Sequence, residues 1–104
     1  VTTIGRAPTN RIVIRDEVCS RNHCEIFQSS NQWTLRDLGS RNGTVINGAR
    51  IAGDWELHDS EVIEIGAYHL YCSFYWVLTV YVITVSPSAG TDTVNSTVVA
   101  SFFA

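Results

Sequence analysis

The sequence predicts an all-β domain, and three observations support that prediction. Turn-forming residues recur at intervals of roughly 8–12 residues along the chain. The runs between these turns are short and rich in β-branched and aromatic residues. No window shows the sustained periodicity of about 3.6 residues that an amphipathic helix would have. Together these features are typical of a β-sandwich or barrel built from many short strands.

The individual strands are expected where apolar or alternating runs lie between polar turns. Gly, Pro, Asn and Ser mark the turns, because they allow positive φ, fix φ or hydrogen-bond the local backbone. Residues 54–60 are interpreted as a polar connection that carries Trp55 and Leu57, and residues 61–65 alternate as a half-buried strand does. The expected strands are, in chain order, residues 1–4, 12–14, 23–28, 33–38, 45–46, 49–51, 61–65 and 68–72.

The composition fits one small domain and limits its partners. The chain has 104 residues, of which 45% are hydrophobic, enough for a single core. Its formal net charge is −3, so a general affinity for nucleic acid or for an anionic membrane surface is not expected. All seven basic residues are Arg, the residue that forms bidentate contacts with phosphate. Those in or beside predicted loops are Arg6, Arg11, Arg15, Arg21 and Arg41.

The cysteine content favours a reducing compartment. Cys19, Cys24 and Cys72 are an odd number of cysteines, and a domain of this size does not need disulfides for stability. No charged leader followed by an apolar stretch opens the chain, so no signal peptide is visible. We therefore expect an intracellular, cytoplasmic location.

Residues 74–104 differ from the rest of the chain. After Glu64 the only charged residue is Asp92, and residues 74–85 are apolar and β-branched. That run is short for a membrane-spanning helix, which needs about 20 apolar residues, and its composition is that of a strand. The sequence therefore predicts a domain over residues 1–73 and an apolar, uncharged tail over residues 74–104.

The loop at residues 36–44 concentrates groups that hold anions. Gly39 and Gly43 allow positive φ, and Ser40 and Asn42 can hydrogen-bond their own backbone. The same loop offers a guanidinium, a hydroxyl, a carboxamide and backbone N–H groups, which are donors that hold phosphate in proteins. Turn chemistry alone also explains the Gly, Asn and Ser residues. Taken by itself, the loop is either an ordinary hairpin turn or an anion site.

Two other loops share this chemistry and complete a longer pattern. The pattern consists of Gly5-Arg6, then Ser20-Arg21-Asn22-His23, then Asp37-Leu38-Gly39-Ser40-Arg41-Asn42-Gly43-Thr44, and finally Asn47-Gly48. In their order and spacing these motifs resemble the forkhead-associated (FHA) domain, and the resemblance covers roughly residues 2–72.

The resemblance implies a β-sandwich of about eleven strands whose loops at one end bind phosphothreonine peptides. By analogy with the family, Arg6 would contact the phosphate and Ser20 would donate its hydroxyl to it. Arg21 would add charge or hold the peptide backbone. Ser40 and Arg41 lie where the family places a further phosphate contact. The remaining assignments are Asn42 as a hydrogen-bonding partner of the peptide main chain, and Gly5, His23, Gly43, Thr44 and Asn47 as architectural positions.

The chain departs from the family pattern at both ends. The family has a strand before the one that leads into Gly5-Arg6, and this first strand is missing here, which should weaken one edge of the sandwich. The last strand of the family ends near Cys72, so residues 73–104 lie outside the match. Three hypotheses for the tail stay open: residues 74–85 replace the missing edge strand, the tail is not native coding sequence, or it begins a membrane anchor.

Catalysis and nucleic-acid binding are alternatives that the pattern favours less. Ser20, His23 and Asp37 could suggest a hydrolase triad, but no Gly-x-Ser-x-Gly elbow is present. Trp33 and Trp55 could stack on bases, but the acidic balance and the absence of Lys count against it. They are expected to pack in the core or at an edge.

A metal site is also disfavoured. Cys19, His23 and Cys24 could supply zinc ligands, but the remaining ligands would have to come from the distant His69 and Cys72. We therefore expect no catalytic residue, no metal and no cofactor. The acidic residues of the later chain are expected to form a solvated face without acid/base pairs: Asp54, Glu56, Asp59, Glu61 and Glu64.

The sequence predicts a non-catalytic module that binds a phosphothreonine-containing protein or peptide and mediates phosphorylation-dependent protein–protein interaction in signalling. It predicts no nucleic-acid partner, and no membrane contact unless residues 74–85 are an anchor. The alternative is a phospho-independent scaffold or assembly domain of the same fold.

Overall fold

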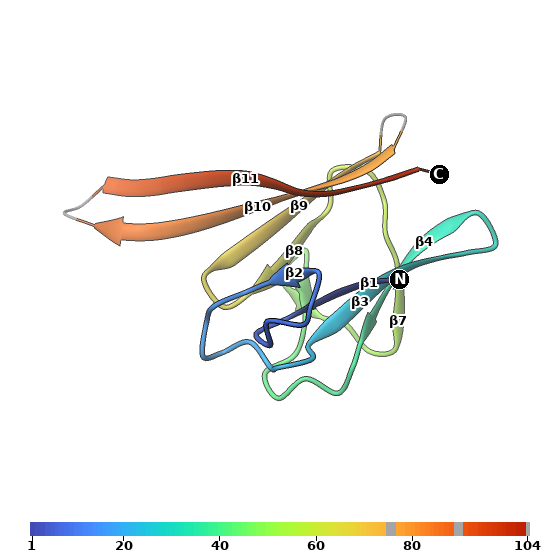
Figure 1. Cartoon of the computed structure of the whole chain (residues 1–104), viewed down its shortest axis with the longest axis horizontal. Helices are drawn as coiled ribbons and strands as arrows, with labels where there is room; N and C mark the ends of the chain where they lie inside the picture. The colour runs from blue at the N-terminus through green and yellow to red at the C-terminus, as the bar shows by residue number, and fades with distance from the viewer. Residues whose placement is uncertain (75–76, 89–90, 104) are drawn as a thin grey trace.

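The computed structural model describes residues 1–74, 77–88 and 91–103, and it confirms an all-β fold over them. Two sheets pack face to face as a sandwich (Figure 1). One sheet has the strand order β2-β1-β3-β4-β7 and the other has the order β11-β10-β9-β8-β5-β6. The strands are β1 (Thr2–Gly5), β2 (Ile12–Val13), β3 (Cys24–Ser29), β4 (Gln32–Asp37), β5 (Val45–Ile46), β6 (Ala49–Arg50), β7 (Asp54–Glu56), β8 (Val62–Ile65), β9 (Tyr68–Phe74), β10 (Val77–Ser88) and β11 (Thr91–Phe103).

Tight turns with positive φ connect neighbouring strands. Ser30 (φ 52°) and Asn31 (φ 62°) join β3 to β4, and Asn47 (φ 54°) and Gly48 (φ 80°) join β5 to β6. Two-residue turns of this kind match the right-handed twist of the strands, and Asn and Gly tolerate the left-handed conformation. The local sequence at these turns therefore sets the register of both hairpins.

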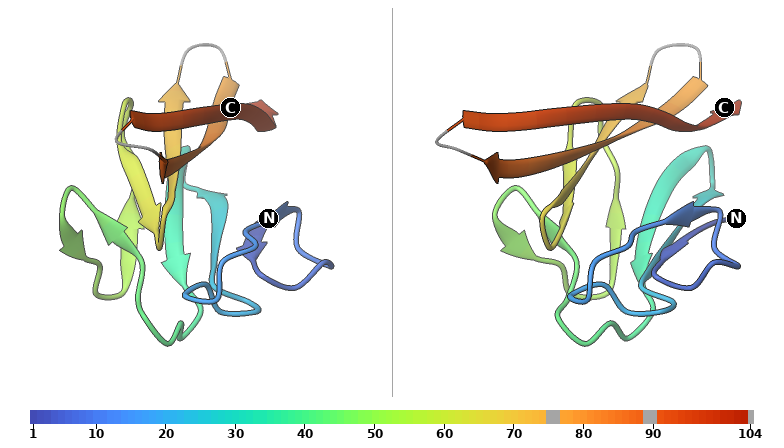
Figure 2. Two further views of the ribbon diagram at one scale, coloured as in Figure 1. Left: turned by 90° about the vertical axis from the view of Figure 1, so that its left-hand side faces the viewer. Right: turned by 60° about the vertical axis from the view of Figure 1, so that its left-hand side comes forward.

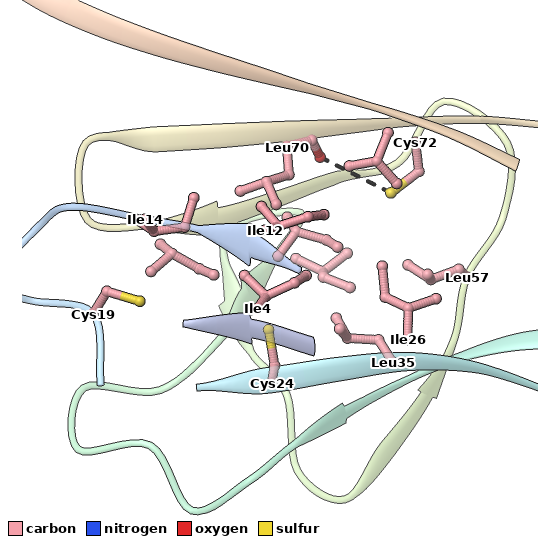
Figure 3. Packing of buried hydrophobic residues seen from close by; sticks show 14 residues of the cluster. Ile4, Ile12, Ile14, Cys19, Cys24, Ile26, Leu35, Leu57, Leu70 and Cys72 are labelled. Carbon is pink, nitrogen blue, oxygen red and sulfur yellow. Dashed lines mark hydrogen bonds between the residues drawn. The ribbon is translucent and has the colours of Figure 1, made fainter. Parts of the chain in front are cut away.

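One core fills the space between the sheets (Figure 3). Its three cysteines are buried and pack as small apolar residues. Burial raises the pKa of Cys19 to about 11 and that of Cys72 to about 12, so both thiols stay neutral and unreactive near neutral pH. The buried members of this core are Ile4, Ile12, Ile14, Cys19, Cys24, Ile26, Leu35, Ile46, Leu57, Ile63, Ile65, Leu70, Cys72 and Val80.

The interpretation of residues 54–60 as a connection was incomplete, because they contain strand β7. It pairs antiparallel with β4, with Trp55 opposite Leu35. Asp54 accepts two hydrogen bonds from the Arg36 guanidinium, at 2.9 Å and 2.8 Å. The strand is only three residues long, and its polar-apolar-polar pattern is too short to stand out from a loop.

The expectation of a solvated acidic face was wrong for Glu61. Its side chain is only 11% exposed and accepts hydrogen bonds from Trp55 Nε1 (3.3 Å) and Asn47 Nδ2 (3.2 Å). The backbone N–H of His58 also donates to it. Glu61 therefore ties the β5–β6 turn to the segment after β7.

The tail forms a long hairpin at the edge of the second sheet. β10 pairs antiparallel with β9 from Leu78 opposite Phe74 to Thr84 opposite Tyr68, and β11 pairs with β10. Both strands continue past the level of Tyr68, the first residue of β9, so that the tip of the hairpin projects from the sheet (Figures 1 and 2). Val80 is fully buried in the core. β10 thus extends the second sheet beside β9, but that it replaces the missing first strand, and the domain boundary itself, stay predictions for experiment.

Two further points bear on the tail. Tyr75 and Trp76, which belong to the predicted apolar run, lie outside the described residues. Within the described residues, no helix has the length and hydropathy that a membrane crossing requires.

If residues 74–104 belong to the domain, a chain of residues 1–73 should be much less stable than the full chain. In that shorter chain β9 would lose its pairing with β10, and the core would lose the side chain of Val80. Val80→Ala in the full chain should lower the free energy of unfolding by about 2 kcal/mol. Urea unfolding followed by tryptophan fluorescence measures both.

Val1→Ala is the matched control, because that side chain is 83% exposed. Equal stability of the two chain lengths, together with a neutral Val80→Ala, would show that the tail is not part of the folded domain.

Candidate functional site

Three loops gather at one end of the sandwich, towards the lower end of both views in Figure 2. They are residues 6–11 after β1, residues 14–23 before β3 and residues 38–44 after β4. Backbone hydrogen bonds join the first two, from Arg6 N to Ser20 O (2.9 Å) and from Ala7 N to Arg21 O (3.1 Å). The third is joined to the second by Arg41 N, which donates to Ser20 Oγ at 3.0 Å. The sequence motifs therefore do converge in space.

His23 links the second and third loops from the buried side. It is fully buried, and its Nδ1 accepts a hydrogen bond from Ser20 N at 3.0 Å. Because Nδ1 is an acceptor, the ring proton lies on Nε2, which donates to Gly43 O at 2.9 Å. The neutral imidazole thus holds the backbone of both loops. It engages the backbone of Ser20 and not the hydroxyl, which is not the geometry of a hydrolase triad.

Asp37 shapes the third loop. Its Oδ2 accepts from Gly39 N (3.0 Å) and Ser40 N (2.9 Å), and its Oδ1 accepts from Thr44 Oγ1 (2.8 Å) and from the Ser40 hydroxyl. Burial alone would raise the pKa of Asp37, but the hydrogen bonds from Ser40 and Thr44 outweigh it and leave the pKa below its ordinary value.

Ser40 therefore differs from the sequence expectation. It was expected to face a ligand, but its side chain is buried and its hydroxyl points to Asp37. The structure places Ser40 with the residues that shape the loop. The signal was present in the sequence, because an Asp three residues before a Ser is a common loop-capping arrangement.

The same three loops carry exposed arginines and the hydroxyl of Ser20. Arg6, Arg21 and Arg41 are exposed, and Arg6 Nε donates to Cys19 O at 3.1 Å, which holds its side chain beside the second loop. Ser20 Oγ accepts from Arg41 N and so keeps its own proton for another acceptor. These groups could together bind a small dianion.

Gly5 is required by the close approach of the first two loops. A Cβ atom at this position would lie 2.2 Å from Arg21 O. The same carbonyl accepts a hydrogen bond from the buried side chain of Asn10, whose Nδ2 lies 2.6 Å away. In the sequence, Asn10 is only one of several turn-forming residues, and no local pattern indicates its contact with Arg21, eleven residues further along the chain.

Asn42 and Asn47 occupy different environments. Asn42 is exposed, and its Nδ2 donates to Val18 O at 2.9 Å, which directs the side chain across the second loop. Asn47 lies in the β5–β6 turn and hydrogen-bonds Glu61, so its contribution is architectural. Thr44 is fully buried, and its hydroxyl donates a hydrogen bond to Asp37.

In the described part of the chain, no group of three or more His, Cys, Asp or Glu side chains is placed to hold a metal ion.

Comparison with known proteins was made by sequence and by structure. The FHA domain profile matches residues 2–66, which include all three loops. A curated relative, the ABC transporter ATP-binding/permease protein Rv1747 of Mycobacterium tuberculosis, is 43% identical over 63 residues. The match covers 61% of this chain and 7% of the relative, so most of that protein lies outside it.

Two solved structures are similar over most of their own length. One is from a structural and functional analysis of phosphothreonine-dependent FHA domain interactions: it is 32% identical, with a TM-score of 0.66, and the match covers 71% of this chain and 76% of that one. The other is the FhaA FHA domain complexed with the intracellular domain of Rv3910: it is 37% identical, with a TM-score of 0.58, and the match covers 62% of this chain and 70% of that one.

Asp37→Asn should lower the free energy of unfolding by about 1–2 kcal/mol at neutral pH, because the new amide group would face hydroxyl and N–H donors. The folded-state pKa of Asp37 is lowered, so its contribution is fully present above the ordinary aspartate pKa of about 4 and is lost as the pH falls through the lower folded value. The difference between wild type and variant should therefore shrink as the pH falls below about 4.

Urea unfolding at several pH values measures this difference, and Glu17→Gln, at an exposed carboxylate, is the control. A difference that is independent of pH would contradict the assigned role of the Asp37 carboxylate.

Proposed function

The chain belongs to the FHA domain family, and on that premise we propose that it is a phosphothreonine-peptide binding module. It would mediate phosphorylation-dependent protein–protein interaction in signalling and would catalyse no reaction itself. The observation that carries the proposal is that hydrogen bonds join the three loops at Ser20. Its Oγ accepts from Arg41 N of the third loop, and its carbonyl accepts from Arg6 N of the first.

The charge and donors of this surface suit a phosphomonoester. Such a group carries a charge of about −1.5 to −2 at neutral pH and has three acceptor oxygens. We assign Arg6 and the Ser20 hydroxyl to the phosphate, because hydrogen bonds fix both. Arg6 Nε is held by Cys19 O of the second loop, and Ser20 Oγ is held by Arg41 N of the third. Arg41 adds a second guanidinium from the third loop, and Arg21 adds charge or holds the peptide backbone.

The peptide main chain is assigned to Asn42. Its Nδ2 already donates to Val18 O, which orients the carboxamide and leaves its oxygen as an acceptor for a peptide N–H. Ser40 is not assigned to the peptide or the phosphate. Its hydrogen bond to Asp37 instead stabilises the shape of the third loop. Preference for phosphothreonine over phosphoserine would require a small apolar niche for the methyl group, worth at most about 1–3 kcal/mol.

The relatives indicate where such a module would act. One similar FHA domain was solved with the intracellular domain of another protein, which favours a cytoplasmic setting for this chain as well. Because the chain matches only 7% of the Rv1747 transporter protein, the activity of that whole protein is not transferred to it.

Arg6→Ala should weaken the binding of a phosphothreonine peptide by about 1.5–3 kcal/mol or more, roughly tenfold to a hundredfold in Kd, while the fold is kept. The physical reason is the loss of a charge-assisted donor to the phosphate. Calorimetric titration of a phosphothreonine peptide library against both proteins measures the effect.

Arg36→Ala is the matched control, since it removes the same charge from an exposed ion pair with Asp54 on the first sheet. Phosphoserine and unphosphorylated peptides complete the series. Equal binding by wild type and Arg6→Ala would refute the assignment of Arg6, and unchanged binding of a partner protein after phosphatase treatment would favour the phospho-independent scaffold.

A further inference from the structure

Arg50 lies against the third loop although it comes from a different hairpin. It belongs to β6, where it pairs with Val45 of β5. A Cβ atom built on Gly43 would lie 2.3 Å from Arg50 Nε and 2.8 Å from Arg50 Cζ. The guanidinium therefore occupies the space that a side chain at position 43 would fill. Gly43 also has φ 84°, a backbone conformation that favours glycine, and the absence of a side chain there leaves room for Arg50.

This contact places a cation beside the proposed path of the peptide. Gly43 directly follows Asn42, the residue assigned to the peptide main chain, and Gly43 O is held by His23 Nε2 at 2.9 Å. The backbone under the guanidinium is thus fixed by a buried side chain. Arg50 extends the positive surface beyond the residues assigned to the phosphate.

The charge of Arg50 is not neutralised within the described part of the chain. Arg36, by contrast, forms ion pairs with Asp54 and Glu25. Arg50 is exposed and has neither of these partners. An arginine side chain that already packs on a rigid surface loses less conformational freedom when it binds a planar anion.

We propose that Arg50 is a specificity-determining residue that selects phosphothreonine targets with a carboxylate side chain, Asp or Glu, at one position near the phosphothreonine. This inference rests on the proposed function. The guanidinium donates charge-assisted hydrogen bonds to the carboxylate, and the geometry leaves Arg6 and Ser20 to the phosphate.

The test uses the full chain and a set of phosphothreonine peptides in which one flanking residue at a time is Glu or Gln. For wild type, Glu at one position should bind about three- to tenfold more tightly than Gln, the range for one partly exposed charge-assisted contact. Arg50→Gln should bring this ratio close to one, and Arg50→Lys should keep a preference for Glu. Arg36→Gln should leave the ratio unchanged.

The ratio separates specificity from a structural role. If Arg50 only supports Gly43, Arg50→Gln weakens the Glu and Gln peptides equally, the ratio stays as in wild type, and the inference is overturned. If the wild-type protein prefers Glu over Gln at none of the flanking positions, the inference is overturned without any variant. Binding of phosphothreonine peptides with no Glu preference defeats the inference alone, whereas no phosphopeptide binding at all defeats the proposed function with it.

Discussion

The arrangement of the three loops at one end of this sandwich depends on one buried, neutral imidazole. His23 accepts from the backbone of Ser20 and donates to the backbone of Gly43, so it fixes two loops that are far apart in the sequence. A buried donor or acceptor left without a partner costs about 1–3 kcal/mol, which makes any other loop arrangement unfavourable. The backbone N–H belongs to Ser20, which we propose as a phosphate contact. The carbonyl belongs to Gly43, which follows Asn42, the residue proposed to contact the peptide main chain. The positions of the residues that we propose for phosphate contact therefore depend on a side chain buried in the fold.

The polar residues divide into a buried set that fixes the loops and an exposed set that carries charge. Asn10, His23 and Thr44 are buried and hydrogen-bonded, whereas Arg6 and Arg41 are exposed above them. No buried side-chain polar atom of the described residues lacks a partner. A site that is already ordered loses little entropy when a peptide binds. The chain as a whole has a charge of −3, so the positive surface is a local property that the loops create.

The sequence was informative wherever the structure is determined locally. The turns at Ser30-Asn31 and Asn47-Gly48 follow from residues that tolerate positive φ, and most strands follow from short apolar runs. The site loops followed from their shared donors and from the family resemblance. Tertiary contacts were not predictable: β7 is recognisable only through its pairing with β4. Glu61 was assigned to solvent because its donors, Trp55 and Asn47, come from other segments, and the inward turn of Ser40 depends on the competing acceptor Asp37.

The central claim is that preformed loops recognise a phosphate and the backbone next to it. Titration of the ¹⁵N-labelled full chain with a phosphothreonine peptide, followed by amide resonances, tests it most directly. The account predicts large shifts at Arg6, at residues 20–21 and at residues 41–43, with little change in strands β3 and β4 and no shifts from the unphosphorylated peptide. Equal shifts from both peptides, or shifts confined to the β10–β11 hairpin, would contradict it.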